Sequence, residues 1–106
     1  MFGLFASNPF IDPQLGVLVR RRGLWRGTIE LAPGVNALLA LSGSRAAPAA
    51  DALHIAVRLP QSFAGWRPAI EGALYEHYSP YAESVAAGED DPPPGGLPRI
   101  DTPADS

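Results

Sequence analysis

The chain has 106 residues, a length that allows a single domain. Its hydrophobic fraction of 46% excludes a fully disordered chain, and its net charge of −3 argues against the basic surface of a nucleic-acid-binding protein. The absence of cysteine excludes disulfides, thiolate metal sites and a cysteine nucleophile, and it favours a cytoplasmic location over secretion.

An extended arm is predicted over residues 1–13, because Pro9 and Pro13 bias the residues before them toward extended or turn geometry. Its large apolar side chains are expected to pack on the core, with an exposed arm as the alternative. They are Phe2, Leu4, Phe5 and Phe10.

Three strands are predicted next, over residues 15–20, 24–31 and 35–41. Strand alternation gives the first two strands one apolar face each. These faces hold Leu15, Val17 and Val19 in the first strand and Trp25, Ile29 and Leu31 in the second. Gly23 and the Pro33-Gly34 pair favour short turns, so we predict an antiparallel meander whose third strand is the most buried.

After Pro48 the apolar and polar residues alternate at the spacing of a helix. A first helix is predicted over residues 49–59, with His54 and Arg58 on its polar stripe and Pro60 at its end. A second helix is predicted from Pro68, with a kink or end at Ser79-Pro80. Its apolar stripe comprises Ile70, Ala73, Leu74, His77, Tyr78 and Tyr81.

The composition changes at Gly88, where an acidic, proline-rich stretch begins. Such a stretch cannot bury enough apolar surface to fold, so residues 88–106 are predicted to form a disordered tail or linker. The predicted fold is therefore one α+β domain over residues 1–87, with a three- to four-stranded antiparallel meander followed by two helices packed on one face.

Two groups of side chains are candidates for an interaction surface, since arginine and exposed aromatic residues are favoured at interfaces. The first group is Arg20, Arg21, Arg22, Trp25 and Arg26, and the second is Tyr75, Tyr78 and Tyr81. The alternative for the arginines is a solvated turn that protects a sheet edge from aggregation. The alternative for the tyrosines is the edge of the core.

No catalytic or cofactor-binding motif is present, and no cofactor is predicted. His54 and His77 are the only histidines. They support a metal-binding or acid–base alternative only if the two predicted helices bring them together. A membrane partner is not expected, because the longest apolar run, residues 37–41, is far shorter than the roughly 20 residues that span a bilayer.

The order of these signals resembles an uncharacterised bacterial family of unknown function. The resemblance rests on Asp12-Pro13-Gln14-Leu15-Gly16, on Trp25-Arg26-Gly27, on Arg67-Pro68-Ala69-Ile70, and on Glu76-His77-Tyr78-Ser79-Pro80-Tyr81. It covers residues 12–84 and implies no activity and no catalytic residue. Related chains continue past a segment like Leu97-Pro98-Arg99-Ile100 into further strands, so this chain resembles the front portion of a longer protein.

The sequence thus favours a non-enzymatic protein-interaction domain that binds an unidentified protein or a second copy of itself. The alternatives are a small enzyme or metal-binding domain that uses His54 or His77, and a binding protein of the toxin–immunity type by analogy of fold. A nucleic-acid partner is not favoured by the net charge.

Overall fold

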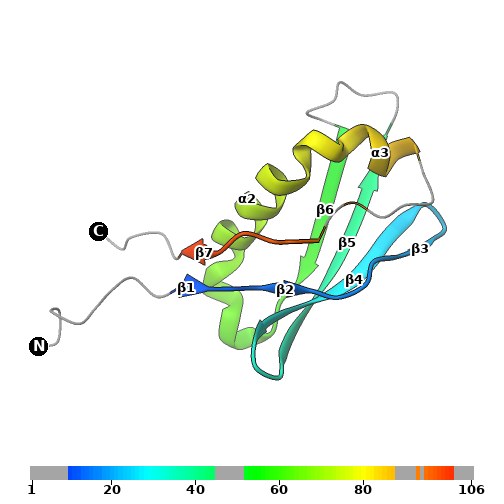
Figure 1. Cartoon of the computed structure of the whole chain (residues 1–106). Coiled ribbons are helices and arrows are strands. Elements are labelled where there is room, and N and C mark those ends of the chain that lie inside the picture. Colours follow the sequence, from blue (N-terminus) through cyan, green and yellow to red (C-terminus); the bar gives the residue numbers. More distant parts are fainter. Residues whose placement is uncertain (1–9, 45–51, 88–92, 94, 102–106) are drawn as a thin grey trace, which may run out of the picture.

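The computed structural model describes residues 10–44, 52–87, 93 and 95–101 (Figure 1). Its strands are β1 (Phe10–Ile11), β2 (Gln14–Leu15), β3 (Val19–Arg21), β4 (Leu24–Ala32), β5 (Val35–Gly43), β6 (Leu53–Arg58) and β7 (Ile100–Asp101). The helical part consists of η2 (Gln61–Trp66), α2 (Arg67–Tyr78), η3 (Ser79–Tyr81) and α3 (Ala82–Ala87).

A five-stranded antiparallel sheet forms the centre of the molecule, in the order β2–β4–β5–β6 with β3 also paired to β4. The turn between β3 and β4 has positive φ at both Arg22 (53°) and Gly23 (81°), the geometry that matches the twist of a hairpin. The α+β class and the antiparallel meander over residues 24–41 are therefore confirmed. The sheet has more strands than predicted.

The predicted first helix is wrong, because residues 53–58 form strand β6, paired with β5 from Leu38↔Arg58 to Gly43↔Leu53. The segment also fits a two-residue period: Leu53 and Val57 are buried, whereas His54, Ala56 and Arg58 are exposed. β-branched Ile55 and Val57 suit a strand, and β5 supplies the partner that a short apolar run needs. Residues 49–51 of the predicted helix lie outside the described residues.

One helical segment replaces the two predicted helices. It starts with η2 after Pro60, and the predicted stripe of the second helix is confirmed, since Ile70, Leu74 and Tyr78 are fully buried. The predicted kink at Ser79-Pro80 appears as the 3-10 turn η3, after which α3 continues to Ala87. No described helix has the length and apolar character needed to cross a membrane.

The helices pack on one face of the sheet, called here the inner face. Side chains from both layers form the core there, and each fully buried aliphatic group contributes about 1.5–3 kcal/mol. The largest fully buried side chains of the core are Tyr78, Ile29, Leu39, Leu41, Ile70, Leu74 and Val85.

The first predicted strand is broken, and its predicted apolar face is wrong. The backbone of Gly16 still bonds to β4, but the register with β4 shifts by one residue between Leu15↔Ile29 and Val19↔Arg26. Val17 and Val19 are therefore exposed, by 83% and 54%, while Leu18 is buried. Gly27 makes this possible because a Cβ there would lie 2.8 Å from Leu18 Cδ2. A glycine within a strand often marks a place where another group comes close to the backbone, and at Gly27 that group is the side chain of Leu18.

The prediction of a disordered tail does not hold for residues 95–101. β7 pairs antiparallel with β1, so the two ends of the described chain lie side by side (Figure 1). Ile100 is 4% exposed and belongs to the core, and Leu97 packs against it. Residues 88–92, 94 and 102–106 of the predicted tail lie outside the described residues.

Candidate functional site

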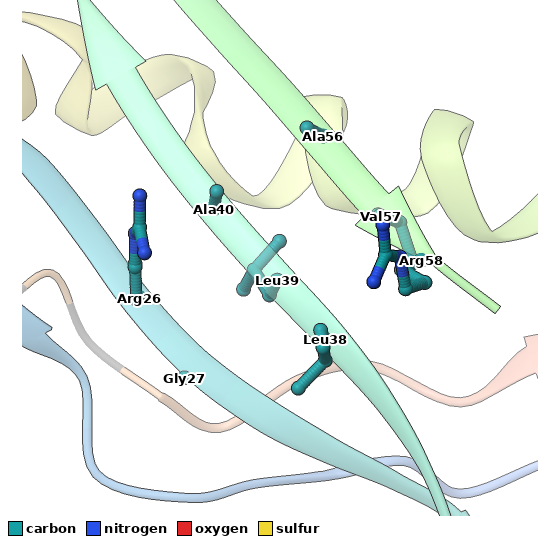
Figure 2. A pocket seen from close by; sticks show the side chains of 8 residues that line it. All are labelled: Arg26, Gly27, Leu38, Leu39, Ala40, Ala56, Val57 and Arg58. Atoms are coloured by element: carbon teal, nitrogen blue, oxygen red, sulfur yellow. The ribbon is translucent and has the colours of Figure 1, made fainter.

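The second face of the sheet, called here the outer face, is not covered by any of the described helices (Figure 2). Cross-strand pairing sets its side chains in rows. One row runs Val19–Arg26–Ala40–Ala56 across β3, β4, β5 and β6. The next row runs Thr28–Leu38–Arg58. Neighbouring residues in a row lie about 4.5–5.5 Å apart at Cβ, close enough to act as one surface.

A hollow of about 570 Å³ lies on this face between Arg26 and Arg58. Figure 2 shows its side chains on three neighbouring strands, with the helices behind them. Ala40 and Ala56 form a shallow apolar floor, because their side chains are small. Leu38 stands beside them and is 51% exposed, which is unusual for leucine in the middle of a strand.

The charge of the outer face is mainly positive. Within the described residues, ion pairs engage Arg67 with Glu71 and Arg99 with Asp101, and neither Arg26 nor Arg58 has such a partner. Arg26 also lines a second hollow of about 260 Å³ together with Arg21 and Arg22. The carboxylate of Glu30, at the far end of this face, accepts a hydrogen bond from the backbone N–H of Gly34 (3.4 Å).

The arginines of the first predicted group lie partly together on the surface, but the aromatic residue predicted beside them does not. Arg21, Arg22 and Arg26 lie together on β3, the following turn and β4. Arg20 is exposed, but Trp25 is 3% exposed and faces the core, so it cannot bind a partner. The alternation of β4 places Trp25 and Arg26 on opposite faces of the sheet.

The predicted tyrosine group does not form one patch. Tyr75 is 40% exposed on α2, Tyr81 is half-buried in η3, and Tyr78 is fully buried. The Tyr78 hydroxyl has no hydrogen-bond partner among the described residues, and burial raises its pKa to about 12. Tyr78 is therefore a core residue and not part of an interaction surface.

The two histidines lie on opposite sides of the sheet. His54 is exposed on the outer face, where it pairs with Ser42, whereas His77 is half-buried on α2 with its ring edge-on to Tyr78 (4.7 Å between centroids). The described residues contain no cluster of three or more potential metal ligands. The structure thus does not bring the histidines together as the metal or acid–base alternative requires.

Sequence reasoning missed the residues that shape the hollow, Leu38, Ala40, Ala56 and Arg58. The last two were assigned to a helix, which hid their alternation with Leu53, Ile55 and Val57. That alternation was the available signal. The sequence held no signal for the exposure of Leu38, because the uncovered face follows from where the helices pack.

No protein-family model matches the chain, and no curated protein and no solved structure matches it either. The resemblance to an uncharacterised bacterial family therefore stays a prediction.

Proposed function

We propose that the chain is a non-enzymatic protein-interaction domain and that its outer face binds an acidic segment of another protein. The observation that carries the proposal is the hollow with an apolar floor and an arginine at each side, on a sheet face that the described helices leave uncovered.

Charge and shape together define the kind of partner. The guanidinium groups of Arg26 and Arg58 are free of ion pairs within the described part of the chain, and guanidinium binds carboxylates in a planar, two-bonded geometry. Leu38 adds an apolar anchor between them. A segment with carboxylates flanking an apolar side chain would satisfy all three groups.

Three alternatives are less well supported. Single-stranded nucleic acid binds to exposed aromatic side chains beside basic groups, and Trp25, the aromatic residue nearest the arginine cluster, is buried. The histidine-based enzyme would need His54 and His77 on one side of the sheet. The toxin–immunity analogy has no support in the described contacts.

The test uses a fluorescently labelled peptide in which glutamate alternates with leucine. Arg26→Gln and Arg58→Gln, each alone and combined, remove the charge while keeping a polar, hydrogen-bonding side chain. We expect the double variant to bind at least about tenfold more weakly, since each charge-assisted hydrogen bond contributes about 1.5–3 kcal/mol. Binding should also weaken as salt is added.

The matched control is Arg99→Gln, which removes one exposed positive charge away from the outer face. It should leave peptide binding unchanged. Equal binding by the wild type and the double variant would overturn the proposal, as would an equal loss in the Arg99 control, which would indicate attraction to the overall charge alone.

A further inference from the structure

The outer edge of strand β6 carries backbone groups that no described strand pairs with. Among the described strands β6 pairs only with β5, and the hydrogen bond from Ser44 N to Ala52 O (2.9 Å) fixes the phase of their ladder. Hydrogen-bonded and non-hydrogen-bonded pairs alternate in an antiparallel ladder. His54 and Ala56 therefore bond to β5, and the backbone N–H and C=O groups of the odd-numbered residues point away from it.

These outward groups belong to Leu53, Ile55 and Val57. The side chain of Arg67 donates a hydrogen bond to the Val57 carbonyl (3.0 Å), which agrees with this phase. The described residues show no partner for the backbone of Leu53 and Ile55 on this side. The edge of β6 thus presents a row of backbone donors and acceptors ready for another strand.

The two edges of the sheet differ in the features that discourage pairing with another strand. The edge formed by β2 and β3 is interrupted at residues 16–18 and carries the arginine run 20–22, both of which discourage pairing with another chain. Residues 53–57 of β6 contain no proline, no bulge and no Lys, Arg, Asp or Glu. Within the described part of the chain, this second edge has none of these protective features and is open to strand addition.

We propose that β6 pairs antiparallel with β6 of a second copy of this chain, centred on Ile55. This inference goes beyond the acidic partner of the outer face and uses another surface. In this register Ile55 exchanges both backbone hydrogen bonds with Ile55 of the second copy. Leu53 and Val57 pair with Val57 and Leu53 of that copy, where the Val57 carbonyl, which already accepts a hydrogen bond from Arg67, accepts a second one through its other lone pair.

The surroundings of the edge favour a second copy over an acidic segment. Arg67, the basic residue whose side chain bonds to the outward backbone of β6, is already paired with Glu71 (3.1 Å). Four apolar residues in β6 and in the chain between β6 and Arg67 are only partly covered by the core, namely Ile55, Leu59, Phe63 and Trp66. An uncharged apolar strand is complementary to such an edge, and residues 53–57 of β6 contain no Lys, Arg, Asp or Glu.

Side-chain pairing across the two-fold axis is also compatible. On the outer face His54 lies opposite Ala56 of the second copy, so no two like charges face each other. On the inner face the half-buried Ile55 side chains meet at the axis and bury their remaining apolar surface. The sheet would continue through both copies, with the two helical layers on the same side.

The first experiment measures the molar mass of the full chain by light scattering over a wide concentration range, with amide hydrogen exchange at both ends of the range. We expect the mass of two chains at high concentration. The Ile55 amide should exchange slowly at high concentration and fast at low concentration. A single-chain mass throughout would overturn the proposal. So would a dimer in which the Ile55 amide exchanges fast, because the contact would then lie elsewhere.

Ile55→Pro is the decisive variant. Its missing N–H is one that points away from β5, so the ladder inside one chain loses no hydrogen bond. We expect a single-chain mass with an unchanged circular dichroism spectrum. Ile55→Lys serves as a second variant if the proline prevents folding, since it opposes two charges at the axis. A persisting dimer in either folded variant would overturn the proposal.

Arg26→Gln is the matched control, because it lies on the outer face of β4, away from the β6 edge. It should remain dimeric. The two proposals fail separately: Ile55→Lys should lose dimerisation and keep binding of the glutamate–leucine peptide, whereas the double arginine variant should show the reverse.

Discussion

At the scale of single residues, the aromatic side chains mark where sequence reasoning succeeds and where it stops. The period of α2 places Tyr78 on the buried stripe, but it does not indicate that the hydroxyl also lies in the core. The Tyr78 hydroxyl and the Trp25 indole N–H both lack a hydrogen-bond partner among the described residues. A buried polar group without a partner costs about 1–3 kcal/mol.

Tyr78→Phe is therefore expected to stabilise the fold by about 1 kcal/mol, because it removes the unpartnered hydroxyl and keeps the ring. The measurement is the free energy of unfolding from urea titration at neutral pH. Tyr75→Phe, at an exposed position of the same helix, is the control and should change little. A loss of stability in Tyr78→Phe would mean that the hydroxyl has a partner in the folded protein.

Stability should also fall at high pH. Burial raises the pKa of Tyr78 from 10.0 to about 12 in the folded state, so above pH 10 the unfolded chain releases the proton first. The contribution of the neutral phenol is complete below pH 10 and is lost as the pH rises through 12, by up to about 3 kcal/mol. Urea unfolding at pH 9 to 12 should show this slope, reduced in Tyr78→Phe. Equal slopes in both proteins would contradict it.

At the scale of elements, the sheet and α2 were accessible from sequence, and β6 was not. β4 and α2 have long, regular periods that only one structure satisfies. β6 is short, and the spacing of its apolar residues fits both a helix and a strand. The strand forms because β5 needs a partner. Without β6, the buried backbone groups of β5 on that side would have no hydrogen-bond partners.

The contact between α3 and β5 depends on Gly43. A Cβ there would lie 2.7–2.9 Å from backbone and Cβ atoms of Ala86, so Gly43→Ala must push α3 away from the sheet. We expect a loss of about 1–3 kcal/mol in the free energy of unfolding. Gly72→Ala, where the added methyl meets nothing within 4 Å, is the control. It should stabilise α2 by about 0.5–1 kcal/mol.

Thermal unfolding of the two alanine variants, followed by circular dichroism, measures both effects. Opposite shifts in melting temperature are expected. Equal shifts of the same sign would contradict the close packing of α3 on β5.

At the scale of the whole molecule, the pairing of β1 with β7 closes the domain. Arg99 lies over the ring of Phe10 (4.1 Å to the centroid) and is paired with Asp101 (3.0 Å), so polar contacts reinforce this junction. Composition predicted only disorder after residue 88. It averages over the stretch and hides the two apolar residues, Leu97 and Ile100, that reach the core.

Ile100→Ala is expected to lower the free energy of unfolding by about 2–4 kcal/mol, because the side chain is 4% exposed within the core. Pro98→Ala, at an exposed position of the same segment, should have a much smaller effect. Chemical unfolding of both variants is the measurement. An unchanged stability of Ile100→Ala would mean that residues 95–101 do not belong to the domain.

The sequence by itself determined which residues within β4 and α2 share a face, and it determined the turns on either side of β4. Tertiary structure alone decided that residues 53–58 form an edge strand, that Leu18 packs over Gly27, and that the described residues leave the outer face and the edge of β6 uncovered. The physical reason is one of range. Periodicity reports the sides of one element, whereas strand pairing and the covering of a face depend on residues far apart in the chain, which a local pattern does not contain.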